Sequence, residues 1–248
     1  MSRLRSALAV LVLILATGLM GGLILLVCRK PPRPALAHRL SRLWGRALLA
    51  ACWGRLKVTG TNHLDPAASY VFVSNHQSAL DIPVLLAALP QQFGFLAKRE
   101  LFELKGLKRP FSWVMVAGGH IPVDREEDAK VRPMVRGATE KLARGESIVV
   151  FPEGTRSPTA EMLPFKKGAF LIARHSGRPV VPVSIIGTRN ILPPTRQIWL
   201  GPPGTVRVVI GAPIASRDKR IAELAQEVRE RIIANCSGVA APGSINKE

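Results

Sequence analysis

Residues 70–97 read YVFVSNHQSALDIPVLLAALPQQFGFLA, and this stretch decides the fold class. Its two ends, Tyr70–Val73 and Phe93–Ala97, are short apolar runs rich in residues that favour strands. Ile82–Leu89, between them, has the composition of a helix. A strand, a helix and a second strand in this order are typical of a sheet with parallel neighbours, because the helix returns the chain to the edge where the first strand began.

The same alternation continues toward the C-terminus. The strand runs are apolar throughout, as expected for strands that are covered on both faces. The sequence therefore predicts an α/β domain with a mostly parallel or mixed sheet flanked by helices. Further strands are expected at His120–Val123, Ser147–Phe151, Val180–Ile186 and Val206–Ile210, and further helices at Glu127–Arg144, Lys166–His175 and Asp218–Ala234.

An uncharged run, Ala7–Cys28, precedes this domain. As a helix it would span roughly 33 Å, enough to cross a hydrocarbon core of about 30 Å. A cleaved signal peptide would need a shorter core and a small-residue cleavage site, whereas here Arg29, Lys30 and two prolines follow. We therefore expect a retained membrane anchor, and Gly18 and Gly22 leave a bent, re-entrant helix as the alternative.

A second helix is expected at Ala35–Leu56, where leucines recur at helical spacing and arginines lie toward another face. Such a basic amphipathic helix suits a membrane surface, and a helix simply packed on the domain is the alternative. More basic residues follow the anchor than precede it, which places the rest of the chain in the cytoplasm, beneath the inner membrane of a bacterium. The predicted parts are an N-terminal membrane-associated helical pair (1–56), the α/β domain (57–236) and a flexible tail (237–248).

The charge balance limits the possible partners. The chain has 35 Lys and Arg against 17 Asp and Glu, a formal net charge of +18, which indicates an anionic partner. Nucleic acid, an anionic membrane and a phosphorylated substrate all fit, but an aromatic content of 5% is low for a protein that stacks single-stranded bases. The three cysteines form no CxxC pair and no disulfide framework.

The first candidate site is the polar segment Asn75–Asp81, directly after the Tyr70–Val73 strand. His76 and Asp81 are five residues apart, so they would not share a face of one helix. They can meet if the helix begins near Asp81, as the proline at position 83 favours. His76 would then be a general base oriented by Asp81. The alternative is an ordinary loop histidine followed by an N-cap aspartate.

The second candidate site is Phe151–Ser157, which follows another apolar strand. Gly154 allows a tight turn, from which Glu153 can bind a glycerol hydroxyl and Arg156 a phosphate. A surface turn with an unrelated ion pair is the alternative. No GxSxG elbow is present, which favours direct attack by an acceptor hydroxyl over an acyl-enzyme route.

Two further segments carry weaker signals. Gly118–Arg125 ends in Arg125, a second candidate phosphate ligand, whereas His120 within it is expected to be structural. Lys98 belongs to a basic group that can hold a donor's phosphates, face anionic lipid, or simply be solvated. Val181–Val183 is an apolar strand containing proline, expected to line or brace a pocket.

Taken in order, these four segments resemble the glycerolipid acyltransferases, in particular the 1-acylglycerol-3-phosphate acyltransferase branch. Asn75–Asp81 matches the NHxSxxD motif, Gly119–Arg125 the glycine–hydrophobic–arginine motif, and Phe151–Ser157 the FPEGTRS motif at every residue. Val181–Val183 matches the fourth motif. Thr155 is typical of this branch, since relatives that act on glycerol 3-phosphate usually differ there.

The resemblance implies His76 as the base and Asp81 as its orienting partner. It implies that the phosphorylated acceptor is bound by Arg125, Glu153 and Arg156, with Lys98, Gly154 and Thr155 as further substrate-binding candidates. It also implies an acyl donor, acyl-CoA or acyl-carrier protein, with no metal and no cofactor. Other expected partners are the lysophospholipid acceptor and membrane lipids, and no nucleic acid.

The reaction expected from this resemblance is a single displacement. His76 deprotonates the sn-2 hydroxyl of lysophosphatidic acid as it attacks the thioester, giving phosphatidic acid, and backbone donors near the helix start stabilise the oxyanion. Another acceptor, such as a lyso-ornithine lipid, is the alternative within the enzyme class. A non-catalytic, basic, membrane-tethered binding protein is the alternative from another class.

Overall fold

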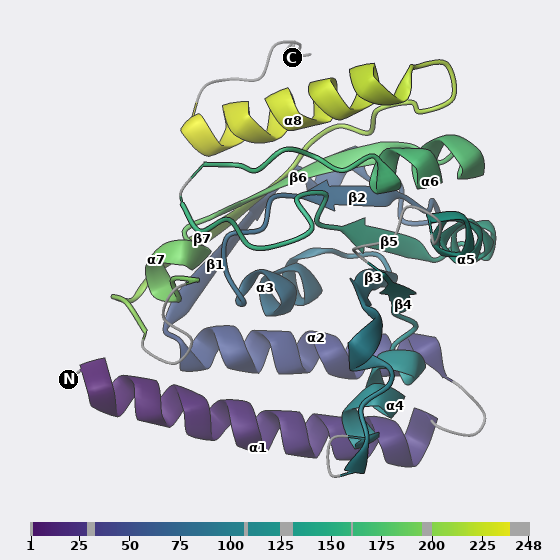
Figure 1. The fold of residues 1–248 in the computed structure, drawn as a ribbon. Coiled ribbons are helices and arrows are strands. Elements are labelled where there is room, and N and C mark those ends of the chain that lie inside the picture. Colours follow the sequence, from purple (N-terminus) through teal and green to yellow (C-terminus); the bar gives the residue numbers. More distant parts are fainter. Residues whose placement is uncertain are drawn as a thin grey trace.

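The computed structural model describes residues 2–28, 33–106, 109–124, 131–159, 161–194 and 200–238. Their centre is a seven-stranded sheet with the order β1-β7-β6-β2-β5-β3-β4 (Figure 1). The strands are β1 Gly54–Thr59, β2 Val71–Ser74, β3 Phe93–Lys98, β4 Ile121–Val123, β5 Ser147–Val150, β6 Val180–Ile186 and β7 Gly204–Ile210.

The sheet is mixed. Strands β2 to β6 run parallel to one another, whereas β7 pairs antiparallel with β6 and carries β1 parallel to itself at the edge. The predicted α/β class with a mixed sheet is therefore confirmed. Because the five parallel strands share one direction, their carboxyl ends all reach the same edge of the sheet, which is where such folds place their sites.

Helices cover both faces of the sheet in layers (Figure 1). One face carries α5 (Val131–Ala143), α6 (Gly168–Ser176) and α8 (Ile221–Ser237), which enclose a core centred on Phe170. The other carries α3 (Asp81–Ala88), with α2 (Pro34–Ala51) beneath it, around a core that contains Phe72 and Phe93. Short elements connect these layers: η1 Thr61–His63, η2 Arg99–Leu101, α4 Arg109–Ala117 and α7 Thr188–Ile191.

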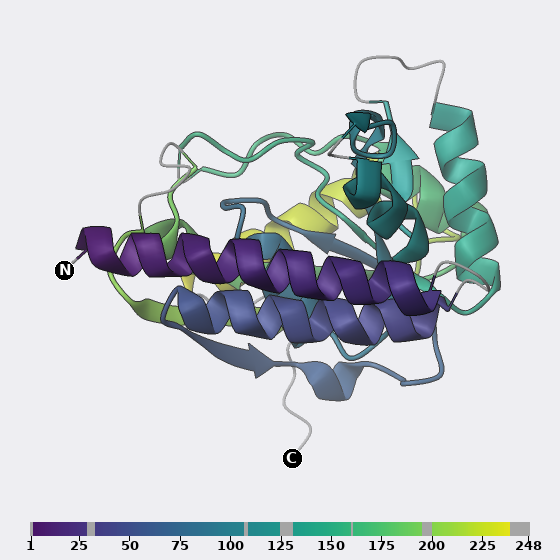
Figure 2. The same ribbon diagram turned by 90° about the horizontal axis from the view of Figure 1, so that it is seen from below.

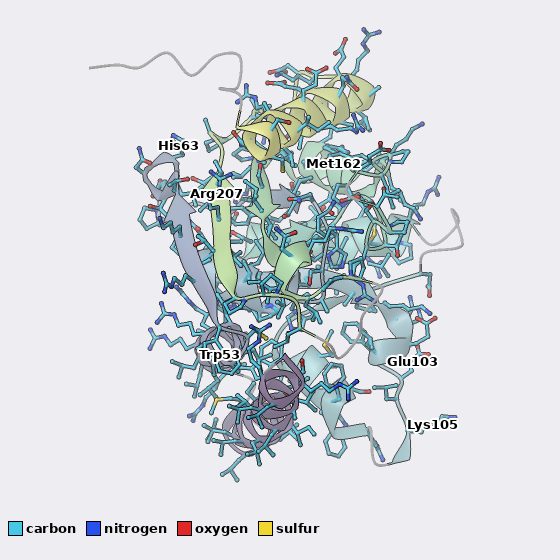
Figure 3. The ribbon with its side chains drawn as sticks, turned by 90° about the vertical axis from the view of Figure 1, so that its left-hand side faces the viewer. Trp53, His63, Glu103, Lys105, Met162 and Arg207 are labelled. Carbon is cyan, nitrogen blue, oxygen red and sulfur yellow. The ribbon has the colours of Figure 1, made fainter. Side chains whose placement is uncertain are left out.

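Helix α1 (Ser2–Cys28) forms the outermost layer, lying antiparallel beside α2 along the domain (Figures 1 and 2). Three contacts fix it there. The Trp44 indole N–H donates to Thr17 Oγ1 at 3.0 Å, and the Leu200 backbone N–H donates to Ser6 Oγ at 3.0 Å. The Arg5 guanidinium lies 5.6 Å from the centroid of the Trp53 ring, which Figure 3 shows beside the end of α1.

The outer side of α1 is apolar and exposed. The part of α1 formed by residues 3–27 is long enough and apolar enough to cross a membrane. Leu4 and Leu26, near the two ends, are 78% and 82% exposed, which is costly in water and favourable in lipid. The helix is therefore suited to a membrane environment while its inner side packs on the domain. Further exposed leucines on α1 are Leu8, Leu11, Leu13, Leu15 and Leu19.

Several predicted boundaries need correction. The second helix ends at Ala51 rather than Leu56, because a tight turn at Trp53, with φ of 52°, starts β1 at Gly54. Helix α4 was not predicted. Helix α5 begins at Val131, and the start of the helix predicted from Glu127 lies outside the described residues.

We predict that Gly45→Ala destabilises the protein, because α2 approaches α3 very closely at this glycine. A Cβ there would lie 2.5 Å from the Pro83 carbonyl oxygen, a distance at which the helices must move apart. Overpacking of this kind costs about 1–3 kcal/mol of unfolding free energy, measurable by denaturant titration in detergent micelles. Gly137→Ala is the matched control, because its Cβ meets open space on a helix. Equal stability of the two variants would contradict the prediction.

Candidate active site

Three of the sequence motifs meet at the carboxyl edge of the parallel strands. Strand β2 leads into the His76 loop, β5 leads into the Phe151–Ser157 turn, and β6 continues through Gly187 into α7. Strands β5 and β6 pair with opposite edges of β2, so the segments that follow them lie on either side of the His76 loop. The sheet order thus brings together segments that lie far apart in the sequence.

His76 and Asp81 are in direct contact. The His76 Nδ1 lies 2.9 Å from Asp81 Oδ2, and the Asp81 side chain is fully buried, whereas that of His76 is 13% exposed. A carboxylate only accepts hydrogen bonds, so Nδ1 carries the ring proton and Nε2 keeps a lone pair. Nε2 has no hydrogen-bond partner among the described residues, so the ring is arranged as a general base.

The same carboxylate oxygen shapes the loop. Asp81 Oδ2 also accepts the backbone N–H groups of Gln77 at 2.6 Å and Ser78 at 2.8 Å. The helix begins at Asp81, as the sequence predicts. These two amides point at Asp81, so they are not the donors expected to stabilise an oxyanion near the start of α3.

Asn75 and Ser78 tie the loop to its neighbours. The Asn75 amide donates to the Ile185 carbonyl at 2.9 Å and accepts the Ile185 N–H at 2.8 Å. The Ser78 hydroxyl donates to the Leu192 carbonyl at 2.7 Å. Both motif residues are buried and act on backbone atoms, so they hold the histidine loop against β6 and α7.

Phe151 supports the imidazole from one face. The two rings are stacked, with centroids 4.0 Å apart and planes 14° from parallel. Phe95 on β3 stacks in turn against Phe151, with a centroid distance of 6.0 Å. With Asp81 on its edge and Phe151 on its face, the His76 ring is restricted to one orientation, which favours catalysis.

The Glu153 carboxylate accepts hydrogen bonds from two backbone N–H groups. Its Oε1 accepts the His76 N–H at 2.7 Å, its Oε2 accepts the Leu163 N–H at 2.8 Å, and the residue is buried. Burial raises the pKa of Glu153, while the two backbone donors counteract this by favouring the charged form. The carboxylate therefore links the turn to the catalytic loop, and its predicted contact with a glycerol hydroxyl stays a prediction.

The structure describes all but one of the remaining predicted binding residues. Gly154 adopts a φ of +74° beside the side chain of Lys166, and Thr155 is exposed. Arg156 is half-buried, and its guanidinium has no hydrogen-bond or ionic partner among the described residues. Lys98 lies 2.8 Å from Glu100 and lines the cavity described below. Arg125 lies outside the described residues.

A cavity of about 850 Å³ opens beside His76. Its walls come from α1, α2, α3, β3 and α4, together with Phe151, and they are almost entirely apolar. His76 and Lys98 are among its few polar lining groups. Gly18 and Gly22, one helical turn apart on α1, leave open space where side chains would stand. The shape and chemistry suit a hydrocarbon chain whose reactive end lies at the imidazole.

His120 also lines this cavity, and its hydrogen bond is internal. Its Nδ1 accepts the Phe95 N–H at 3.1 Å. Burial, reinforced by the nearby Lys141, lowers the pKa of His120 to about 4, so it is neutral at physiological pH. Over the described ranges, no group of three or more His, Cys, Asp or Glu side chains is placed to hold a metal ion.

The comparison with protein families matches residues 55–186 to the family described as Acyltransferase. The match runs from β1 to the end of β6 and contains the His76–Asp81 pair and the Phe151–Ser157 turn. It spans more than half of the chain, so the chain belongs to the acyltransferase family.

Curated relatives with similar sequences share the name 1-acyl-sn-glycerol-3-phosphate acyltransferase. The chain is 34% identical over 196 residues to the chloroplastic 1-acyl-sn-glycerol-3-phosphate acyltransferase BAT2 of Brassica napus, covering 79% of this chain and 54% of the relative. It is 32% identical over 160 residues to the human beta enzyme of the same name, covering 64% and 56%. The chain thus spans about half the length of these curated relatives.

A solved structure is similar over its whole length. The crystal structure of PlsC from Thermotoga maritima, a 1-acyl-sn-glycerophosphate acyltransferase, superposes with a TM-score of 0.79 at 26% identity. The match covers 100% of both chains, so the N-terminal helices are part of the shared fold.

Sequence reasoning missed one basic residue at the site. Arg189 on α7 contacts the Ser157–Thr159 turn through its guanidinium. It follows the fourth motif by a few residues, and a single arginine in a polar connection carries no signal of its own. Its role is seen only in the folded protein, because α7 follows β6 at the same edge of the sheet where the turn follows β5.

We predict that Glu153→Gln lowers stability as well as activity. One of its two acceptor oxygens becomes an NH₂ group that faces a backbone N–H, so one buried donor loses its partner, at a cost of about 1–3 kcal/mol. Thermal unfolding in micelles measures this loss. Glu161→Gln is the matched control, because this exposed carboxylate lies in the same connection. Loss of activity with unchanged stability would instead favour direct substrate binding by Glu153.

Proposed function

We propose that the protein transfers a fatty acyl group from acyl-CoA or acyl-carrier protein to the sn-2 hydroxyl of lysophosphatidic acid, giving phosphatidic acid for phospholipid synthesis. The observation that carries this proposal is the His76–Asp81 pair, whose histidine lines an apolar cavity. The names of the relatives support the same acceptor.

In the proposed reaction, His76 Nε2 takes the proton of the acceptor hydroxyl while that oxygen attacks the thioester carbonyl carbon. Asp81 stabilises the resulting imidazolium through Nδ1. The new C–O ester bond forms as the C–S bond breaks, and the imidazolium returns its proton to the departing thiolate. The thioester is already activated and the imidazole supplies the base, so the proposed reaction requires no metal or cofactor.

The acceptor's phosphate needs cationic partners beside the imidazole. Arg156, which follows the Glu153 turn, has an unpaired guanidinium that can bind a phosphate bidentately. Lys98 at the cavity wall is a second candidate, since its exposed pair with Glu100 can open at little cost. Arg125 is proposed from the sequence motif alone.

Membrane docking through α1 accounts for access to the lipid. Leu4 and Leu26 on α1 are largely exposed, and residues of α1 line the same cavity as the catalytic histidine. A lysolipid and an acyl chain can therefore approach His76 without leaving an apolar environment. The charge asymmetry around α1 supports a cytoplasmic position for the α/β domain, where the donor is found.

We predict that His76→Ala lowers kcat by at least about 10²-fold, the usual contribution of a positioned general base. The measurement is thiol release from acyl-CoA in the presence of lysophosphatidic acid, with purified membranes. His175→Ala, at an exposed position on α6, should retain activity. Near-normal turnover in His76→Ala, or preferential use of a phosphate-free acceptor by the wild type, would overturn the proposed function.

We further predict that Gly18→Leu and Gly22→Leu shift the preferred acyl chain to shorter lengths. Each leucine would fill cavity space that the glycine leaves open. Each methylene of the acyl chain that the leucine excludes from the cavity loses roughly 0.8 kcal/mol of hydrophobic binding free energy. Exclusion of two or more methylenes would therefore make a shorter acyl-CoA the preferred donor. Competition among acyl-CoAs of increasing length measures the change. Ala16→Leu, on α1 but away from the cavity lining, is the control, and an equal shift in it would contradict the prediction.

A further inference from the structure

Arg189 is the second residue of α7, the short helix that follows β6. Its guanidinium donates to three consecutive backbone carbonyls of the turn after Arg156. Nη1 donates to Ser157 O at 3.0 Å and to Thr159 O at 2.7 Å, and Nη2 donates to Pro158 O at 2.6 Å. One side chain therefore holds the whole turn.

This arrangement requires an arginine. The planar guanidinium of an arginine presents several N–H donors in fixed directions and can bind three neighbouring carbonyl oxygens at once. The ammonium of a lysine is smaller and has no such fixed geometry. No carboxylate pairs with Arg189 among the described residues. The side chain is half-buried and serves backbone groups instead of a counter-ion.

The turn that Arg189 holds is also attached to the catalytic loop. The Ser157 N–H donates to the His76 carbonyl at 3.0 Å, and the Ser157 hydroxyl donates to Glu161 O at 2.6 Å. Ser78 reaches Leu192, just beyond α7. The turn is thus fixed from two sides, and Arg156, with no partner of its own, depends on this backbone for its position.

We propose that Arg189 is a positioning residue for the acceptor site: it holds the Ser157–Thr159 turn so that the Arg156 guanidinium stays directed at the acceptor's phosphate. This inference rests on the proposed function, in which Arg156 binds that phosphate. Arg189 itself contacts protein carbonyls and acts through Arg156.

The charge of Arg189 offers a competing explanation, because an unpaired cation near the site would attract an anionic acceptor at a distance. The two explanations differ for Arg189→Lys. This variant keeps the positive charge but loses the planar fork, so it should preserve activity if charge alone matters and should impair it if geometry matters.

The first experiment compares wild type, Arg189→Lys and the control Arg174→Lys, an exposed position on α6, in the full-length protein in membranes. We expect Arg189→Lys to raise the KM for lysophosphatidic acid about tenfold with kcat within about twofold, since a displaced binding group mainly weakens acceptor binding. In an Arg156→Ala background, Arg189→Lys should add nothing further. An inactive wild type would refute the proposed function itself.

The second measurement does not depend on activity. Limited trypsin digestion followed by mass spectrometry reports cleavage between Arg156 and Ser157. This cleavage should be several-fold faster in Arg189→Lys than in wild type or Arg174→Lys, because the turn is released. Unchanged cleavage, an unchanged KM, additivity with Arg156→Ala, or a global fall in the unfolding midpoint would each overturn the proposal.

Discussion

A single buried oxygen atom, Asp81 Oδ2, organises the catalytic end of this protein. A buried carboxylate needs hydrogen-bond donors, and here the His76 ring and the amides of Gln77 and Ser78 all converge on Oδ2, whereas Oδ1 has no partner among the described residues. The three contacts to Oδ2 define one loop conformation, and that conformation also sets the tautomer of the imidazole. The contacts to Asp81 Oδ2 thus stabilise the buried charge and also orient the catalytic histidine.

The helices around His76 form an apolar cavity through which a lipid can reach this oriented base. The α/β domain supplies His76 and apolar lining residues from α3, β3 and α4, whereas α1 and α2 supply the other apolar walls of the cavity. The cavity is therefore formed by both parts of the chain together. Helix α7 directly follows β6 at the carboxyl edge of the sheet, and its Arg189 contacts the turn that follows Arg156. The catalytic pair thus belongs to the α/β domain, whereas the cavity for the substrate is completed by the N-terminal helices.

The sequence predicted the parallel core strands and the meeting of His76 with Asp81, because Pro83 indicated where the helix must begin. It assigned Gly54–Leu56 to the preceding helix and predicted no strand at Gly54–Thr59, since a short run with alternating polarity fits the end of an amphipathic helix as well as an edge strand. The backbone-binding role of Glu153 was hidden, because its partner His76 is 77 residues away. Arg189 was equally hidden, since its function depends on carbonyl groups that every residue type possesses.

The pairing of β1 imposes an order on assembly. This strand lies at the sheet edge and has only β7 as a neighbour, so Gly54 must wait for Gly204 to be synthesised. The buried contact between Ser6 and Leu200 joins positions 194 residues apart in the same way. Closing such long loops is slow, and the apolar first helix emerges from the ribosome long before its partner Leu200. The bilayer is a natural place for that helix to reside meanwhile, so insertion would precede completion of the cavity.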